Sequence, residues 1–348
     1  MALIYFTDAN SAVGYVNLQK ENLTEITKIY HLKSPDERLV HNILEQLSLV
    51  LNARHLVLEY IYSTFNPDFL AGLIIRELDM AFTSGKEVSD DAEIVDLISV
   101  YDGLVIEENA GEIELIRTKM NQFYKRMYMH LNVALHIHDE WESIYIDRMD
   151  FEKANQFKRD FITRLFDTEI PANGRGTQLT HRFFGAMTPD GIHDFIPELT
   201  AGLTRYLIKG RPGSGKSTLM RGVLKKAVEL GYDVDIYYCS LDPKSLDMVV
   251  VPELHFCVFD ATAPHEYEAV FAHDEVVDTY TAFIREGTDE RCEGILEEIK
   301  MKYKNQIKLA LVAMQGGHLA RAQLSDIYAD AVVLERLDSV LEGLVGKL

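Results

Sequence analysis

Residues 210–217, GRPGSGKS, constrain this chain more than any other part of its sequence. They fit the pattern G-x-x-x-x-G-K-[ST], which is typical of a phosphate-binding loop (P-loop, or Walker A motif). The apolar residues 205–209 before the loop predict a buried strand, and residues 218–228 after it have helical spacing and precede Gly231, a natural helix stop. A strand, a glycine-rich loop and a helix in this order are the context that the motif requires.

The residue types in this stretch suit phosphate chemistry. Glycines lack Cβ, so the loop can adopt positive φ and bring backbone N–H groups close to phosphate oxygens. The positive end of the following helix points at the same anion. We expect Lys216 to contact the β- and γ-phosphates and Ser217 to ligate Mg²⁺. The predicted nucleotide-binding residues are Gly210, Arg211, Pro212, Gly213, Ser214, Gly215, Lys216, Ser217 and Thr218.

Composition limits the partners that the chain can have. Its 348 residues carry 35 Lys and Arg against 55 Asp and Glu, a net charge of -20. An acidic surface repels nucleic-acid backbones and anionic membranes, so neither is expected as a partner. The three cysteines, Cys239, Cys257 and Cys292, have no metal-binding spacing, and the N-terminus has no basic region typical of a signal peptide. We therefore expect a soluble, cytoplasmic protein with reduced cysteines.

Two similar segments follow one another along the chain. Strands are expected at residues 29–33, 55–62 and 77–82 and again at 205–209, 233–239 and 254–260, and residues 182–196 resemble a hairpin around a turn at 188–190. A helix is expected at residues 36–51, and mostly helical signals fill residues 91–165 and 275–348. The turn-rich residues 171–176 suit a linker. The predicted domains are therefore 1–170 and 171–348.

A shift of 176 positions aligns the first segment with the second. Over residues 30–78 it superposes seven identical residues without a gap, and it places strand on strand and loop on loop. Residues 34–41, SPDERLVH, then stand opposite the loop 210–217 and contain no glycine. Val40 replaces the phosphate lysine, and two acidic residues would repel a triphosphate. The pattern predicts an internal duplication whose first copy has lost nucleotide binding.

Two aspartates in the second segment are candidates for catalysis. Asp260 ends an apolar strand about forty residues beyond the loop, where a P-loop protein keeps the Walker B carboxylate that holds Mg²⁺. Its alternative role is to cap the turn that follows. Asp242 comes directly before a proline in a loop after a strand, and it is equally consistent with orienting water near the γ-phosphate or with a simple turn. The predicted catalytic residues are Lys216, Asp260 and Asp242, and the predicted metal ligands are Ser217 and Asp260.

Two groups of histidines have weaker patterns. His265 and Glu266 lie just beyond the Walker B strand, where they could contact attacking water or a second substrate, or could be exposed loop residues. His138 and Glu142 share one face of an expected helix, which is possible metal-ligand geometry. A solvated acidic helix face is the other interpretation of that stretch.

The chain resembles a family of bacterial proteins of tandem P-loop ATPase type, built from two P-loop-like halves. The resemblance rests on RYLIKGRPGSGKSTLM, YYCSLDPKSLDMVVVPEL and FDATAPHEY. Both halves can carry a P-loop in that family, so this chain departs from it in the first half, and any mechanism that needs two bound nucleotides is in doubt. The resemblance implies ATP binding and hydrolysis.

The sequence therefore predicts an α/β protein with two tandem P-loop NTPase-like halves, each followed by long helices that could pack as an antiparallel bundle. The expected function is Mg²⁺-dependent binding and hydrolysis of ATP by the second half. Two alternatives stay open: a kinase that phosphorylates a small molecule or protein, and a nucleotide-gated interaction protein with negligible turnover. Partners beyond the nucleotide, including a second copy of the chain, are not identified by the sequence.

Overall fold

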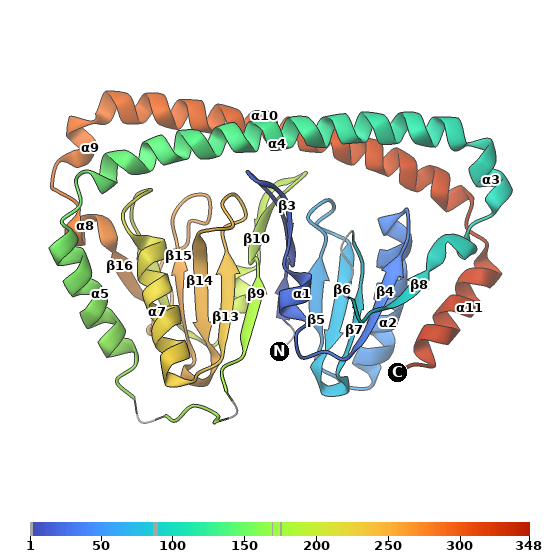
Figure 1. Ribbon diagram of the computed structural model, residues 1–348, viewed down its shortest axis with the longest axis horizontal. Helices are drawn as coiled ribbons and strands as arrows, with labels where there is room; N and C mark the ends of the chain where they lie inside the picture. The colour runs from blue at the N-terminus through green and yellow to red at the C-terminus, as the bar shows by residue number, and fades with distance from the viewer. Residues whose placement is uncertain (1–2, 86–89, 169, 175) are drawn as a thin grey trace.

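Two six-stranded mixed sheets lie side by side beneath a pair of long helices (Figure 1). This computed structural model describes residues 3–85, 90–168, 170–174 and 176–348. The first sheet contains β1 (Leu3–Tyr5), β4 (Lys28–Lys33), β5 (Glu59–Tyr62), β6 (Leu70–Ile75), β7 (Met80–Thr83) and β8 (Glu93–Asp96). Its spatial order is β1-β5-β6-β7-β4-β8, and β6 is antiparallel to both of its neighbours.

The second sheet repeats this arrangement strand for strand. It contains β9 (Leu179–Arg182), β12 (Thr204–Lys209), β13 (Val234–Tyr238), β14 (Leu246–Val251), β15 (Phe256–Asp260) and β16 (Glu275–Asp278). Its order is β9-β13-β14-β15-β12-β16, again with one antiparallel strand, β14, in the third place. The bounds of β6 and β14 differ by 176 at both ends, so the alignment made from the sequence places equivalent strands opposite each other.

The two sheets meet where β1 approaches β9. Phe6 and Phe183 exchange backbone hydrogen bonds of 3.0 and 2.9 Å, and both side chains are buried. Above this contact stand two hairpins, β2 (Asp8–Ser11) with β3 (Gly14–Asn17) and β10 (Gly185–Thr188) with β11 (Gly191–Asp194). The second hairpin confirms the one that the turn at residues 188–190 predicts.

One amphipathic helix follows the fourth strand of each half. α2 (Glu37–Ala53) begins after Asp36, whose carboxylate accepts the Arg38 N–H, and it buries its leucine-rich face on the first sheet. α7 (Lys216–Leu230) packs on the second sheet and ends at Gly231, which adopts φ of 85°. A residue without Cβ is favoured there because the left-handed conformation is costly for others.

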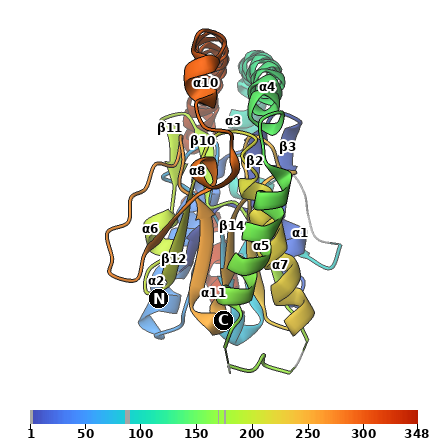
Figure 2. The same cartoon turned by 90° about the vertical axis from the view of Figure 1, so that its left-hand side faces the viewer.

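Two long helices connect the halves. α4 (Ala110–Ile146) and α10 (Glu293–Asp330) run antiparallel across the top of both sheets (Figures 1 and 2). Their backbones approach closely at Gly316 and Gly317, where an added Cβ would lie within 3.0 Å of the rings of Phe123 and Tyr124. The predicted antiparallel packing of the long helices is therefore confirmed, although the bundle consists of a single pair.

Each long helix delivers the next helix to the other half. α5 (Phe151–Leu165) follows α4 and packs beside α7 on the second sheet, where Phe161 and Leu165 are buried (Figure 2). α11 (Leu334–Val345) follows α10 and packs beside α2 on the first sheet. The predicted boundary at residue 170 separates the sheets in sequence, but each half is completed by a helix that belongs to the other segment.

Several predicted elements need correction. The strand predicted at residues 55–62 begins at Glu59, because His55 adopts φ of 62° and turns the chain. The strand predicted at 77–82 is a 3-10 turn followed by β7, and residues 91–165 begin with β8. Among residues 171–176, Arg175 lies outside the described residues. The smaller elements are α1 (Gln19–Asn22), η1 (Arg76–Leu78), η2 (Leu97–Val100), α3 (Gly103–Glu108), α6 (Ile196–Leu199), η3 (Pro252–Leu254), α8 (Thr279–Phe283) and α9 (Thr288–Arg291). None of the described helices combines the length and apolar composition that crossing a membrane requires.

Candidate functional site

The loop 210–217 lies at the carboxyl ends of β12 and β15, which are adjacent and parallel. From β12 the chain crosses over β15 and β14 to reach β13, whereas from β15 it crosses β12 to reach β16 on the other side. The crossovers therefore leave these two strands in opposite directions. Such switch points open a crevice at the carboxyl edge of a sheet, and ligands bind there in open α/β sheets.

The backbone of the loop depends on its glycines. Gly213 and Gly215 adopt φ of 73° and 86°, which residues with Cβ rarely do. A Cβ at Gly210 would lie 2.2 Å from the Thr279 hydroxyl, which in this structure donates to the Lys209 carbonyl at 3.0 Å. The loop is thus tied to the start of α8, and α7 begins within it, so its amides and the positive helix end face the same space.

Lys216 and Asp260 meet at this edge. The Lys216 ammonium lies 3.5 Å from the Asp260 carboxylate and donates to the Arg211 carbonyl at 3.0 Å. Asp260 also accepts the Thr262 N–H at 3.0 Å, so it both caps the turn and faces the lysine. Ser217 accepts the Leu246 N–H at 3.0 Å, which orients its hydroxyl. The sequence-based pairing of Lys216, Ser217 and Asp260 therefore corresponds to one cluster in space.

Asp247 joins this cluster, although the sequence did not mark it. On the antiparallel strands β14 and β15, Met248 is paired with Phe259, so the next pair along the ladder is Asp247 with Asp260. Burial, and secondly the charge of Asp260, raise the pKa of Asp247 to about 7. The signal was a single carboxylate in the otherwise apolar run LDMVVV.

A cavity of about 1170 Å³ opens above the loop. All nine residues predicted to bind nucleotide line it, as do Asp242, Asp247 and Asp260. Asp242 also accepts the Lys244 N–H at 3.2 Å, as a turn aspartate does, so the structure is consistent with both of its predicted roles. Arg211 forms an ion pair of 2.9 Å with Asp289.

The charges around the cavity balance, unlike those of the whole chain. Its basic lining residues are Lys158, Lys209, Arg211, Lys216, Lys244, Lys300 and Lys304, and its acidic ones are Asp139, Glu142, Asp242, Asp247, Asp260, Glu266 and Glu268. Seven of each sign give no net charge, in a protein whose net charge is -20. The lining of the cavity is thus less negative than the molecule as a whole, which lowers the repulsion of an anion.

Helix α4 covers the cavity and touches the loop. The Gly213 N–H donates to the Glu142 carboxylate at 3.2 Å, and a Cβ on Gly213 would lie 2.4 Å from the Glu142 backbone oxygen. A carboxylate oxygen thus bonds one of the backbone N–H groups that the sequence assigns to phosphate. Glu142 comes from the first segment of the chain, so both segments build this site.

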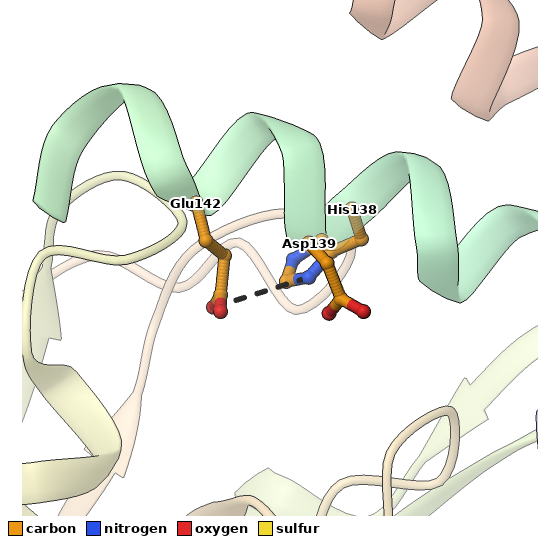
Figure 3. A group of neighbouring side chains, drawn as sticks. All are labelled: His138, Asp139 and Glu142. Carbon is orange, nitrogen blue, oxygen red and sulfur yellow. Dashed lines mark ion pairs between the residues drawn. The ribbon is translucent and has the colours of Figure 1, made fainter.

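His138, Asp139 and Glu142 project from α4 next to one another (Figure 3). One ligand atom from each lies within 4.8 Å of the others, which is close enough for a metal ion to bridge them. Burial lowers the pKa of His138, although the nearby Glu142 acts in the opposite direction, so the ring is neutral at pH 7. Asp139 is largely exposed, and the group equally fits a solvated helix face.

His265 also lines the cavity. It follows β15, has 7% of its surface exposed, and its Nδ1 lies 2.8 Å from a carboxylate oxygen of Asp194 on β11. Its neighbour Glu266 lines the same cavity. Of the two interpretations of His265, the exposed loop residue is wrong.

In comparisons with known proteins, no family model, curated protein or solved structure matches this chain. The functional argument therefore depends on the residues of the site.

Proposed function

We propose that the cavity above the loop 210–217 binds a Mg²⁺ complex of ATP and that the protein hydrolyses it. The observation that carries this proposal is the meeting of the Lys216 ammonium and the Asp260 carboxylate, 3.5 Å apart, beside a glycine loop at the head of α7. A cation, a metal-binding carboxylate and converging backbone N–H groups are the three elements that phosphoryl transfer requires.

The residues divide the work by chemistry. Backbone N–H groups of residues 213–217 hold the β-phosphate, and Lys216 neutralises the β- and γ-phosphates. Ser217 and Asp260 supply the hard oxygen ligands that Mg²⁺ prefers. When bound, the ion offsets phosphate charge. Within this scheme the fold is a tandem pair of P-loop NTPase-like halves, of which only the second binds nucleotide.

The size of the cavity favours a kinase as the second candidate. Pockets for a drug-sized ligand measure about 300–1,000 Å³. At about 1170 Å³ this cavity exceeds that range, and it extends from the loop to Lys300 and Lys304 on α10 and to the hairpin residue Met187. The additional space could admit a small phosphoryl acceptor beside ATP.

Isothermal titration of Mg²⁺–ATP into wild type and Lys216→Ala tests the proposal. We expect one site per chain and a loss of affinity of at least about 100-fold in the variant, equivalent to about 2.7 kcal/mol. Release of phosphate from the same samples then identifies an ATPase, whereas ADP formed without phosphate, and only with an acceptor, identifies a kinase. Wild type that binds no nucleotide contradicts the proposal.

A further inference from the structure

His265 and Asp194 form a pair typical of a general base and its orienting carboxylate. The Asp194 carboxylate accepts hydrogen bonds at 2.8 Å from His265 Nδ1, at 2.7 Å from the Tyr267 hydroxyl and at 3.3 Å from the Ile196 N–H. Burial alone would raise the pKa of Asp194, but these hydrogen bonds outweigh it and lower the pKa. An ionised Asp194 accepts only, so Nδ1 carries a proton, and in the neutral ring Nε2 is the nitrogen that has the lone pair.

The absence of a side chain at Gly185 on β10 leaves space for this pair. A Cβ at Gly185 would lie 2.9 Å from both His265 Cε1 and Asp194 Cβ, so only glycine permits the imidazole to lie against β10. Phe184 packs edge-on against the ring, with centroids 4.8 Å apart. Within the described part of the chain, Nε2 has no hydrogen-bond partner. The orientation of the imidazole ring is therefore fixed, and its Nε2 is available to a ligand in the cavity.

The charged groups around His265 connect it to the phosphate site. Asp194 on β11 and Tyr267 lie on one side of His265, and Asp247 on β14 lines the same cavity as His265. Asp247 is opposite Asp260, which faces Lys216. The residues of this series that line the cavity are Lys216, Asp247, Asp260 and His265.

We propose that His265, held by Asp194, is the base that deprotonates the oxygen nucleophile attacking the γ-phosphorus, an inference that rests on the proposed function. The Nε2 lone pair takes the proton of an O–H group as its oxygen bonds the γ-phosphorus. The bond from that phosphorus to the β–γ bridging oxygen breaks, and ADP leaves. His265 then releases its proton to solvent. The nucleophile is water in hydrolysis or an acceptor hydroxyl in a kinase; the base chemistry is shared.

Within residues 3–85 and 90–168, the part of the first segment that the structure describes, no such pair is found. The bounds of β3 and β11 differ by 177, which places Asn17 opposite Asp194. Asp8 stands opposite Gly185, so the first half has a side chain at the position where the second half has glycine. The pair occurs in the half that keeps the glycine loop and is missing from the half that lost it. That distribution is expected of a catalytic device, whereas a packing contact has no reason to follow the loop.

The test compares His265→Gln and Asp194→Asn with wild type and with His193→Gln, a histidine beside Asp194 that does not line the cavity. We expect all four proteins to bind Mg²⁺–ATP within about threefold of one another. Turnover should fall by about 10²–10⁴-fold in His265→Gln, with loss of the limb of the pH–rate profile that reports the base. Asp194→Asn should lower kcat with little change in KM, as expected of a positioning residue.

A second measurement does not depend on turnover. In protein labelled with ¹⁵N-histidine and free of nucleotide, His265 should be the Nδ1–H tautomer in wild type and should change in Asp194→Asn. Free phosphate among the products identifies water as the nucleophile, and ADP alone identifies an acceptor hydroxyl. Full turnover in His265→Gln, or a proton on Nε2 in wild type, overturns the proposal. If wild type does not bind ATP, the proposed function is contradicted instead. The experiment therefore distinguishes a wrong function from a wrong base.

Discussion

At the end of β12 a glycine loop leads into α7, whereas at the end of β4 the equivalent residues lead directly into α2 without a glycine. The frame around both points is the same. The Leu246 N–H donates to Ser217 at 3.0 Å, and at the matching position the Leu70 N–H donates to His41 at 3.1 Å. The backbone contact is thus the same in both halves, although His41 lacks the hydroxyl oxygen that Ser217 has.

The helix that crosses each site also differs. The isolated bridges Tyr101–Val332 and Met149–Ile284 relate the helical parts by 183 positions, since 284 minus 101 and 332 minus 149 both equal 183. By this shift Arg321 and Ser325 of α10 correspond to His138 and Glu142 of α4. Arg321 lies 3.4 Å from Glu37, the residue opposite Gly213, and Ser325 donates to Asp36.

The two halves differ in how the long helix contacts the residues after the fourth strand: an ion pair closes this position in the first half, and a hydrogen bond to the backbone occupies it in the second. In the first half a loop carboxylate and a helix arginine neutralise each other, and Arg321 also packs over Phe65, 4.4 Å from the ring centroid. In the second half the helix carboxylate, Glu142, accepts the Gly213 N–H and lies 3.9 Å from His138 on its own helix, and it has no arginine partner among the described residues. A phosphate oxygen can replace the Glu142 carboxylate at the Gly213 N–H, whereas in the first half Glu37 and the stacked Arg321 already neutralise each other.

The largest effect on stability should come from removing the ion pair between Arg321 and Glu37 in the first half. Arg321→Leu removes the partner of Glu37 and leaves a partly buried carboxylate without its cation. We expect the free energy of unfolding to fall by about 2–3 kcal/mol, less than the 3–5 kcal/mol of a fully buried pair. Urea denaturation followed by circular dichroism measures the change.

The matched control is His138→Leu, at the equivalent position of α4. It should cost less than about 1 kcal/mol, because a neutral, partly exposed ring is replaced by a side chain of similar size. Equal losses in the two variants would contradict the view that only the first half is held closed by charge.

Much of this arrangement could be predicted from the sequence, because it depends on local patterns. The glycine loop, its strand and its helix follow from spacing, and the repeat is detectable because Pro67 and Pro243 punctuate equivalent loops. The antiparallel strands β6 and β14 were missed. Each is a short apolar run directly after a turn, and such runs carry no period that separates a strand from a helix.

The site was only half predictable for a different reason. Lys216 and Ser217 follow β12 and Asp260 ends β15, two strands of one segment whose carboxyl ends a P-loop motif is expected to bring together. Glu142 reaches Gly213 from 71 residues away in sequence, through a helix that crosses between the halves. No local pattern records which sheet a 37-residue helix will cover, because its amphipathic face suits either.

The carboxylate pair offers a smaller test of the same comparison. Asp247 and Asp260 correspond to Ala71 and Ser84, whose side-chain hydroxyl simply donates to the Ala71 carbonyl at 2.7 Å. The raised pKa of Asp247, about 7, means that the folded state keeps a proton that the unfolded state releases near pH 4. Asp247 therefore destabilises the nucleotide-free protein increasingly as pH rises from 4 to 7, and fully above 7.

Asp247→Asn should consequently stabilise the protein at pH 8 by about 1–2 kcal/mol more than at pH 5, a value reduced from the full linkage because the side chain is partly exposed. Thermal unfolding at both pH values measures the difference. Ala71→Asn at the equivalent position of the first half serves as the control and should show no such pH dependence. A stabilisation that is independent of pH would show that Asp247 is ionised at both values.

The smallest effect concerns the hydrogen bond between the Gly213 N–H and the Glu142 carboxylate in the second half. In the proposed function the Glu142 carboxylate and a phosphate oxygen compete for the Gly213 N–H, and their negative charges repel. Glu142→Gln keeps the shape and removes the charge, so ATP affinity should rise about three- to tenfold, equivalent to about 1 kcal/mol. Asp139→Asn removes a charge from the same helix without touching the loop and should change affinity less than twofold. Titration of ATP into both variants at low ionic strength distinguishes them, since a general effect of helix charge would raise both affinities equally. A fall in affinity for Glu142→Gln would mean that the carboxylate helps to hold the ligand, and the second half would then close around its nucleotide with a charge from α4, as the first half closes with Arg321 from α10.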